Sequence, residues 1–364
     1  MRLALYCPIY GFYETEKDKI GRQGEFYTSV SVGELFGQLL AFQFSELLGQ
    51  YESDPEHQGR QDKFQIVEAG AHRGDLARDI LQWLSEHRPE IFEQTEYCLV
   101  EPSERRRSWQ ARVLAGFEDR VRWVADLNEL EGKGIRGIIF SNELFDSMAV
   151  HRVTWDAAQS RWFEWGVIKK EGGFEWAKME PERSIEVKET GLGKLPAALL
   201  DVLPHGFTTE ICPEAERWWK SAAQALHWGK LMTIDYGFSA EELLAPERKN
   251  GTLRAYRKHQ VSTDLLANPG EQDLTAHVNF SALERAGHEA GLITDCFTSQ
   301  SRFLTGILAR MRSQQHIPTV WTSKLTRQFQ TLTNPEHLGQ SFRVLVQSRG
   351  GDRTADAVLR TAWD

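Results

Sequence analysis

The chain has 364 residues, of which 41% are hydrophobic and 26% charged, so it can bury the core of an ordinary globular protein. No apolar run approaches the roughly 20 residues of a membrane-spanning helix, and we expect no membrane span. The formal net charge of −9 argues against a nucleic-acid partner, because phosphate backbones favour a basic surface.

The cysteines and the start of the chain indicate a compartment. The four cysteines lie far apart and include no pair with the spacing of a zinc site. Proteins of reducing compartments rarely form disulfides, and the spacing of these four cysteines is typical of free thiols in such a compartment. Residues 1–9 contain neither a long apolar stretch nor a small-residue cleavage site. We therefore expect a cytoplasmic location.

The first long helix is predicted at residues 32–48, where apolar residues recur at helical spacing. Its apolar stripe should dock on a core, and we expect residues 1–60 to form an N-terminal helical cover. Thr28 and Ser29 precede this helix. They could cover a bound cofactor, or they could simply cap the helix.

Strands and helices alternate over the next part of the chain, which is the pattern of a parallel, doubly wound sheet. Ser103 is positioned to cap the second helix. The predicted strands are residues 64–68, 97–101, 121–124 and 137–140, and the predicted helices are residues 75–84 and a segment that runs past Trp109. The sequence therefore predicts an α/β, Rossmann-like fold.

The pattern changes after residue 150. Residues 150–155 and 161–168 are rich in β-branched and aromatic residues and flank a polar turn, which predicts an antiparallel hairpin. A helix at residues 213–227, a fifth parallel strand at 230–235 and a last strand at 342–347 follow. We expect residues 61–240 and 280–364 to form the core, with the hairpin inserted near residues 150–170. Residues 241–279 should form an elaboration.

Polar residues and glycines follow each of the first four predicted strands, where ligands of open α/β sheets bind. Glu101 is placed to accept hydrogen bonds from two ribose hydroxyls. Asp126 is placed to accept one from an adenine amino group, with Leu127 beside the ring. The residues are Glu68 at the end of the first strand with Gly70, His72 and Gly74 after it, Glu101 at the end of the second, Asp126 and Leu127 after the third, and Asn142 and Glu143 after the fourth.

The glycine spacing separates two classes of nucleotide cofactor. A dinucleotide pyrophosphate favours a G-x-G-x-x-G turn, whereas here three residues separate Gly70 from Gly74 and acids lie nearby. S-adenosylmethionine has a sulfonium and an ammonium group and no phosphate, so an acid-lined pocket suits it. The pattern favours S-adenosylmethionine, as methyl donor, over NAD. Taken singly, each of these residues is also common in ordinary strand-end turns.

With these residues the chain resembles a known family, the MidA-type S-adenosylmethionine-dependent methyltransferases, which include the mitochondrial complex I assembly methyltransferase. The matching segments run in order along nearly the whole chain. They are residues 4–13 (ALYCPIYGFY), 24–29 (GEFYTS), 34–37 (ELFG), 66–70 (IVEAG), 141–146 (SNELFD), 234–237 (IDYG), 251–257 (GTLRAYR), 268–277 (NPGEQDLTAH) and 341–346 (SFRVLV).

The resemblance implies a seven-stranded class I methyltransferase fold with a substrate-side elaboration. It also implies N-methylation of an arginine on a protein partner, such as a subunit of a respiratory complex or of another assembly. Two departures stand out. The family usually has glycine at the position of His72, and it usually has a helix before the segment that matches residues 4–13. A histidine in the turn would lie close to the methionine part of the cofactor, so it could point outward or weaken binding.

Three residues are candidates for the chemistry. We expect Glu143 and Asp146 to clamp a guanidinium group, with Asn142 near the cofactor, because carboxylates hold that cation through charge-assisted hydrogen bonds. Alternatively, Asn142 and Asp146 cap a following helix. His277, in the segment after the fifth strand, could serve as a base or could be structural.

Two other functions remain open at this point. One is methylation of a small molecule, because a fold alone does not set the substrate. The other is a non-catalytic assembly or binding protein with a degenerate cofactor site, for which His72 is the main argument. The sequence does not indicate an oligomeric state.

Overall fold

The computed structural model describes residues 1–14, 28–52, 63–130, 132, 134–257, 260–262, 264–316 and 321–350. The chain divides into two compact units. We call Asp18–Leu144, Trp219–Tyr236 and Ala286–Asp364 the core unit, and Met1–Lys17, Phe145–Trp218 and Gly237–Arg285 the accessory unit. The domain ranges expected from the sequence stay a prediction. Among the described helices, none is long and apolar enough to cross a membrane.

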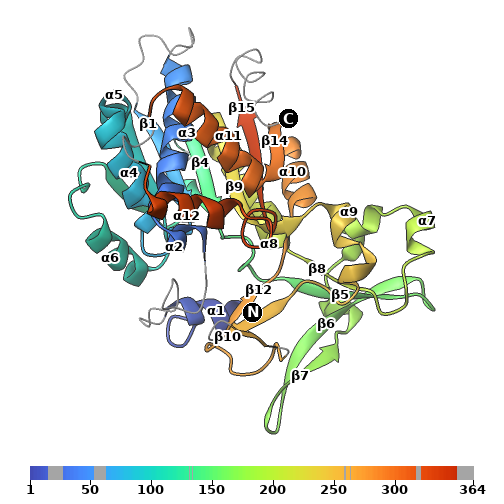
Figure 1. Ribbon diagram of the computed structural model, residues 1–364. Coiled ribbons are helices and arrows are strands. Elements are labelled where there is room, and N and C mark those ends of the chain that lie inside the picture. Colours follow the sequence, from blue (N-terminus) through green and yellow to red (C-terminus); the bar gives the residue numbers. More distant parts are fainter. Residues whose placement is uncertain are drawn as a thin grey trace. The chain divides into compact units, whose positions relative to one another are not determined.

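The core unit is built on a sheet with the strand order β3-β2-β1-β4-β9-β15-β14 (Figure 1). The first five strands in this order pair in parallel, whereas β15 runs antiparallel to both β9 and β14. The expected mostly parallel α/β sheet is therefore confirmed. The strands are β1 (Phe64–Ala69), β2 (Thr95–Val100), β3 (Val121–Val124), β4 (Ile135–Asn142), β9 (Leu226–Phe238), β14 (Ile293–Ser299) and β15 (Phe342–Arg349).

The middle of this sheet is buried on both faces, which explains its continuous apolar runs. All residues of β4 except Arg136 are buried. Glycine is required at position 137, because a Cβ there would lie 2.2 Å from the carbonyl oxygen of Gln65 on β1. Close pairing of β1 and β4 brings their carboxyl ends to the same edge of the sheet.

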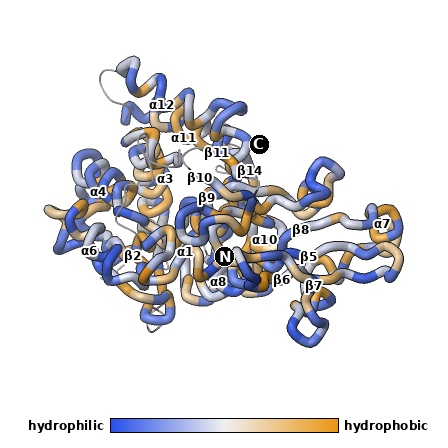
Figure 2. The backbone as a smooth tube through the Cα atoms, turned by 90° about the horizontal axis from the view of Figure 1, so that it is seen from below, coloured by the Kyte–Doolittle hydropathy of each residue, from blue (hydrophilic) through white to orange (hydrophobic). Residues whose placement is uncertain are grey.

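Helices pack on this sheet. α3 contacts α4, α11 and α12, and hydrophobic residues occupy most of its length (Figure 2). It begins at Leu35 rather than at residue 32, because Gly33 has a φ of 139° and separates it from α2. The helices with residues in this unit are α2 (Ser29–Val32), α3 (Leu35–Glu52), α4 (Asp75–His87), α5 (Pro89–Gln94), α6 (Glu104–Val113), α8 (Pro213–Ala225), α10 (Phe280–Glu289), α11 (Gln300–Ser313) and α12 (Ser323–Thr333), with the 3-10 turn η2 (Leu127–Leu130).

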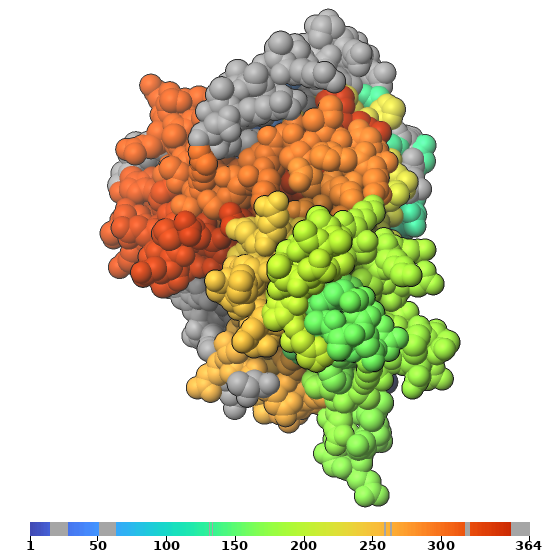
Figure 3. Space-filling view, turned by 90° about the vertical axis from the view of Figure 1, so that its right-hand side faces the viewer, coloured from blue at the N-terminus to red at the C-terminus, as the bar shows by residue number. Residues whose placement is uncertain are grey.

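The accessory unit contains two small antiparallel sheets with the orders β7-β6-β5-β8 and β11-β10-β12. The predicted hairpin is confirmed as β5 and β6, and the structure adds β7 and β8 to it. The β6–β7 hairpin extends beyond the rest of its own sheet (Figure 3). The strands are β5 (His151–Asp156), β6 (Arg161–Lys170), β7 (Gly173–Lys178), β8 (Thr208–Ile211), β10 (Arg254–Arg257), β11 (Gln260–Ser262) and β12 (Asp273–Thr275). β13 (Val278–Asn279) lies in neither sheet and pairs in parallel with the last residues of β9.

Short helical segments complete the accessory unit. They are α1 (Arg2–Tyr6), η1 (Phe12–Glu14), η3 (Pro181–Arg183), η4 (Val187–Glu189), η5 (Gly191–Lys194), α7 (Ala197–Leu200), α9 (Ala240–Leu243) and η6 (Pro246–Arg248). The segment after the fifth parallel strand, expected as an elaboration, thus forms α9, η6 and the sheet of β10–β12.

Candidate functional site

The carboxyl ends of four neighbouring strands lie side by side at one edge of the core sheet. Ala69, the last residue of β1, pairs with Val100 of β2 and Ser141 of β4, and Val100 pairs with Val124 of β3. The structure therefore brings the predicted strand-end residues together within the core unit. They are Glu68, Gly70, His72, Gly74, Glu101, Asp126, Leu127, Asn142 and Glu143.

β1 passes into α4 through a turn that contains three left-handed residues. Gly70, His72 and Gly74 have φ angles of 79°, 44° and 88°. Glycine adopts this conformation freely, whereas histidine pays a strain of about 1–2 kcal/mol. Gly74 is the N-cap of α4, and its amide donates to the carbonyl of Ala71 at 2.7 Å. His72 thus adopts the left-handed backbone conformation that glycine favours, at the position where the family usually has glycine.

Gln110, on α6, connects this turn to the end of β2. The residue is fully buried. Its Nε2 donates to the carbonyl of His72 at 3.0 Å and to Oε2 of Glu101 at 3.2 Å, and its Oε1 accepts from Nε1 of Trp123 at 2.9 Å. Gln110 therefore fixes the glycine turn relative to Glu101, a role that sequence reasoning missed.

The carboxylate of Glu101 is held in one orientation just beyond β2. Its side chain is 1% exposed and lies 3.3 Å from Nε of Arg106. Its Oε1 also accepts the amide of Ser103 at 2.9 Å. Ser103 caps α6, as expected, since its side chain accepts the amide of Arg106. The neighbouring acid, Glu68, is 2% exposed and accepts a hydrogen bond from the hydroxyl of Tyr97 at 2.6 Å.

Burial changes the protonation of Glu68. It raises the pKa of Glu68 to about 7, and the hydrogen bond from Tyr97 opposes the rise. Glu68 is therefore protonated far more readily near neutral pH than an exposed glutamate. Beyond β3, Leu127 is buried, whereas Asp126 is exposed and its Oδ1 caps the amide of Asn128 at 2.9 Å.

The end of β4 is strained and tightly held. Glu143 has a φ of 53°, in the left-handed region. Its amide donates to the carbonyl of Ile234 at 3.0 Å. Its Oε1 accepts the amide of Ser29 at 3.2 Å and Nδ2 of Asn142 at 3.0 Å. The carboxylate of Glu143 is therefore fixed by groups from β4 and α2.

Asp235, on β9, is a second residue of this region that sequence reasoning left out of the site. It is fully buried. Its Oδ2 accepts the amide of Leu144 at 3.1 Å and its Oδ1 accepts the amide of Tyr236 at 2.8 Å. Asp235 thus holds the residue that directly follows Glu143.

Thr28 has the capping role that was one of its two expected roles. Its side chain accepts the amide of Ser31 at 3.1 Å, and the hydroxyl of Ser31 completes a capping box of α2. The matched residues 24–27 lie outside the described part of the chain. Contact of Thr28 with a cofactor stays a prediction.

The prediction that Asn142 and Asp146 cap a helix is wrong. Residues 143–150, which are fully described, form bends and a turn and no helix. The reason is the backbone at Glu143, whose positive φ turns the chain, so that Asp235 receives the next amide. Asp146 is buried in the accessory unit, and its carbonyl accepts the amide of Ala276 at 2.8 Å.

His277 also lies in the accessory unit. Its ring makes an edge contact with Phe238, with 4.9 Å between ring centroids. Burial, followed by the charges of Arg254 and Arg248, lowers the pKa of His277 to about 4. The ring is therefore neutral at pH 7, and a base of this pKa is a weak proton acceptor. Its predicted role as a base remains a prediction.

Acidic and phenolic groups from separate family segments meet in the accessory unit. The hydroxyl of Tyr13 donates to Oδ1 of Asp273 at 2.8 Å, and its ring stacks on Tyr6 at 5.5 Å between centroids. Burial, followed by Asp273, Tyr6 and Asp146, raises the pKa of Tyr13 well above its ordinary value. Asp146 and Asp273 are thus two buried carboxylates close to one phenol.

The strand-end residues fit S-adenosylmethionine. Glu101, Asp126 and Asn142 offer oxygen acceptors, and the glycine turn offers bare backbone, which suits hydroxyl, amino and ammonium donors. Oδ1 of Asn142 is buried and has no hydrogen-bond partner among the described residues, so an acceptor is available there. No group of three or more His, Cys, Asp or Glu residues in the described part could hold a metal ion.

Comparisons with known proteins give the same cofactor. A family model described as "Putative S-adenosyl-L-methionine-dependent methyltransferase" matches residues 40–298. A crystal structure from Burkholderia thailandensis, bound to S-adenosyl-homocysteine, is 30% identical, with a TM-score of 0.80 over 99% of this chain and 89% of that chain.

Curated relatives match over most of their length. The protein arginine methyltransferase NDUFAF7 of Danio rerio is 26% identical over 94% of this chain and 81% of its own. The Homo sapiens protein of the same name is 27% identical over 94% of this chain and 77% of its own. The strand order and the glycine turn agree with the family match, which covers most of the chain. This protein therefore belongs to the family of S-adenosyl-L-methionine-dependent methyltransferases and uses S-adenosylmethionine as its methyl donor.

Proposed function

We propose that this enzyme N-methylates an arginine side chain of a protein acceptor. The observation that carries the proposal is the similarity to relatives named protein arginine methyltransferase, which extends over 94% of this chain. Glu143 of the core unit supplies chemical support, because a guanidinium cation needs carboxylate partners.

The reaction requires a positioned nitrogen and a place for its proton. When bound, S-adenosylmethionine supplies a methyl group on a positively charged sulfur. As the nitrogen–carbon bond forms and the carbon–sulfur bond breaks, the guanidinium nitrogen must give up a proton. A fixed carboxylate holds the cation in line and accepts its hydrogen bonds, and the released proton passes to water. Glu143 has the necessary fixed orientation, because the amide of Ser29 and the side chain of Asn142 hold its Oε1.

A second pair of carboxylates lies in the accessory unit. Asp146 and Asp273 are 6% and 3% exposed there. The role of Asp146 as a further guanidinium clamp stays a prediction from the sequence, and we assign the protein acceptor to the class of subunits of larger assemblies.

The test uses the purified full chain, a labelled methyl donor and a cell lysate. We expect the label in protein, and acid hydrolysis of that protein should release methylated arginine. Label confined to the low-mass fraction would instead indicate a small-molecule acceptor, and labelled lysine or histidine would contradict arginine.

Glu143→Gln provides the internal control for the site. It should abolish transfer while the affinity for S-adenosyl-homocysteine, measured by calorimetry, changes less than about threefold, because the amide keeps the shape of the side chain and removes its charge. Transfer by this variant at the normal rate would show that Glu143 does not hold the acceptor.

A further inference from the structure

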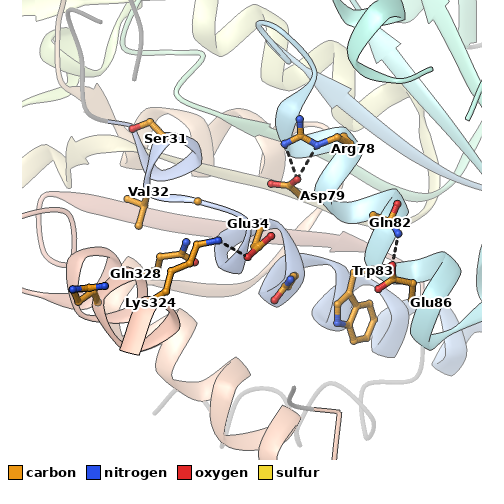
Figure 4. A pocket seen from close by; sticks show the side chains of 13 residues that line it. Ser31, Val32, Glu34, Arg78, Asp79, Gln82, Trp83, Glu86, Lys324 and Gln328 are labelled. Carbon is orange, nitrogen blue, oxygen red and sulfur yellow. Dashed lines mark hydrogen bonds and ion pairs between the residues drawn. The ribbon is translucent and has the colours of Figure 1, made fainter. Parts of the chain in front are cut away.

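A pocket of about 1000 Å³ lies in the core unit among the α2–α3 junction, α4 and α12 (Figure 4). It is lined by charged and polar side chains, and none of the strand-end residues of the methyl-donor site lines it. The methyltransferase reaction described above therefore makes no use of it. Ligands bind in concave sites, where a few converging polar groups fix their orientation.

α12 presents cations to this pocket, whereas α4 presents two carboxylates together with Arg78, which pairs with Asp79. Lys324 and Gln328 lie on the α12 side, and Asp79, Gln82 and Glu86 lie on the α4 side (Figure 4). Arg327 adds a second cation to the α12 side. A ligand with both charges would therefore find a partner on each side.

The cations of α12 are available to a ligand. Arg327 is exposed, and its guanidinium has no partner among the described residues. Lys324 pairs with Glu34 at 3.0 Å, but these side chains are 65% and 48% exposed. Such exposed pairs contribute about 0–1 kcal/mol, so a ligand carboxylate can compete for the lysine.

The sequence around α12 shows a second sign of an anionic partner. Residues 296–335 contain no aspartate or glutamate, although the whole chain has 52 of them and a net charge of −9. The same stretch contains Arg302, Arg310, Arg312, Lys324 and Arg327. An acid-free stretch in an acidic chain concentrates positive potential on α11 and α12.

The opposite side of the pocket offers acceptors. Oε1 of Gln38, which lines the pocket, is buried and has no hydrogen-bond partner among the described residues. Asp79 is bonded to Arg78 at 2.9 Å, and burial, as the largest cause, raises the pKa of Asp79. An added cation or N–H donor would stabilise both groups.

We propose that this pocket docks a mixed-charge segment of the protein acceptor, at a distance from the arginine that is methylated. An acidic side chain of the segment binds Lys324 and Arg327, and a basic or amide side chain faces Gln38 and Asp79. This proposal rests on the proposed protein acceptor. Nucleic acid is a poorer occupant, because the carboxylates of α4 repel its phosphates.

The same pocket is connected to the methyl-transfer site through α2. Ser31 and Val32 line the pocket, and the amide of Ser29 donates to Glu143. The hydroxyl of Ser29 donates to Gln300 at 3.0 Å, and Nε2 of Gln300 donates to the carbonyl of Leu332 on α12 at 3.0 Å. A segment bound against α2 and α12 would therefore hold the helix that positions Glu143.

The experiment compares two double charge reversals in the full chain. K324E/R327E changes the pocket, and R302E/R312E makes the same charge change on α11 in the same acid-free stretch, outside the pocket. The rate of methyl transfer into lysate protein is measured against lysate concentration. We expect K324E/R327E to raise the half-saturating concentration about tenfold, with the plateau rate and the affinity for S-adenosyl-homocysteine unchanged, and the control to stay within about twofold. Equal effects of the two variants, or no effect of the first, would overturn the proposal.

A binding measurement separates failure of docking from failure of the proposed function. The probe is a random copolymer of glutamate and lysine, titrated by calorimetry into wild type and both variants. Weaker binding by K324E/R327E alone supports the pocket even if wild type labels no protein, which would reject only the proposed function. Absence of copolymer binding by wild type rejects the docking site. Stronger pocket-dependent binding of duplex DNA or anionic vesicles than of the copolymer would reject a protein segment as the occupant.

Discussion

The side-chain amide of Gln110 donates to Oε2 of Glu101 at 3.2 Å, and the same nitrogen donates to the carbonyl of His72 at 3.0 Å. One residue of α6 thus links the carboxyl ends of β1 and β2, which carry the glycine turn and the expected ribose acceptor. The relative position of these two features depends on Gln110 as well as on the strands.

Replacing Gln110 by Leu should damage both stability and cofactor binding. The change removes hydrogen bonds to His72 and Glu101 and leaves Nε1 of the partly buried Trp123 without its acceptor. We expect the free energy of unfolding to fall by about 2–4 kcal/mol and the affinity for S-adenosyl-homocysteine to fall about tenfold. Denaturant unfolding and calorimetry measure these changes. Gln82→Leu, on the exposed surface of α4, should stay within about 0.5 kcal/mol.

Asp235→Asn should disturb the turn after β4. Both carboxylate oxygens of Asp235 accept backbone amides, those of Leu144 and Tyr236, and an asparagine would direct its own NH₂ group at one of these donors. We expect a loss of about 2 kcal/mol in unfolding free energy and faster hydrogen exchange at Leu144. Methyl transfer should fall because Glu143 loses its fixed backbone. Unchanged exchange at Leu144 would contradict this role, and the exposed Asp126→Asn serves as the stability control.

Local patterns were sufficient to predict β1, β2, β3, β4, β9, β15 and most of the strand-end residues, whereas the edge strand β14 was not predicted. β3 occupies the predicted residues 121–124, and α4 begins at the predicted Asp75 after the glycine turn. The strands are mostly apolar, and the helix has apolar residues at helical spacing and begins after a glycine. Such patterns can be recognised from the local sequence alone. A polar residue directly after such a run is visible without any tertiary information, which is why Glu68, Glu101 and Glu143 could be named.

Residues whose role depends on distant segments could not be predicted in this way. Gln110 lies within a polar helix, and only its contact with His72, 38 residues earlier, shows that it is buried. Asp235 belongs to a predicted strand, but its bonding partner Leu144 is 91 residues away. β8 was missed because Thr208–Ile211 is short and pairs with β5, far earlier in the chain.

Glu68→Gln should remove a pH dependence of stability. The pKa of Glu68 rises from 4.5 to about 7 on folding, so between these values the native state binds a proton that the unfolded state has released. The contribution of Glu68 to stability is therefore full below pH 4.5 and falls by roughly 3 kcal/mol as the pH rises to 7. Relative to wild type, the variant should gain this amount over the same range in denaturant unfolding. A difference that is constant with pH would contradict the raised pKa, and Glu104→Gln, exposed on α6, is the matched control.

His277→Gln should reveal the opposite dependence on pH. The pKa of His277 falls from 6.5 to about 4 on folding, so below pH 6.5 the unfolded state binds a proton that the native ring does not. Wild type should lose stability as the pH falls from 6.5 to 4, by at most roughly 3 kcal/mol, and the variant should lack this loss. Because the ring is neutral and weakly basic at pH 7.5, we expect the variant to keep at least about a tenth of the transfer rate. Abolished transfer, with normal unfolding, would identify His277 as a base.

His72 allows a test of whether the turn or the side chain limits cofactor binding. With a φ of 44°, His72→Gly relieves strain but adds freedom to the unfolded chain, so stability should change by less than about 1 kcal/mol. His72→Val places a β-branched residue in a conformation that it disfavours and should cost about 1–2 kcal/mol. If backbone shape is what the cofactor requires, S-adenosyl-homocysteine should bind the glycine variant at least as tightly as wild type and the valine variant less tightly. A loss of more than about tenfold in the glycine variant would instead mean that the imidazole contacts the cofactor, and the histidine would then be a specific feature of this chain's methyl-donor site.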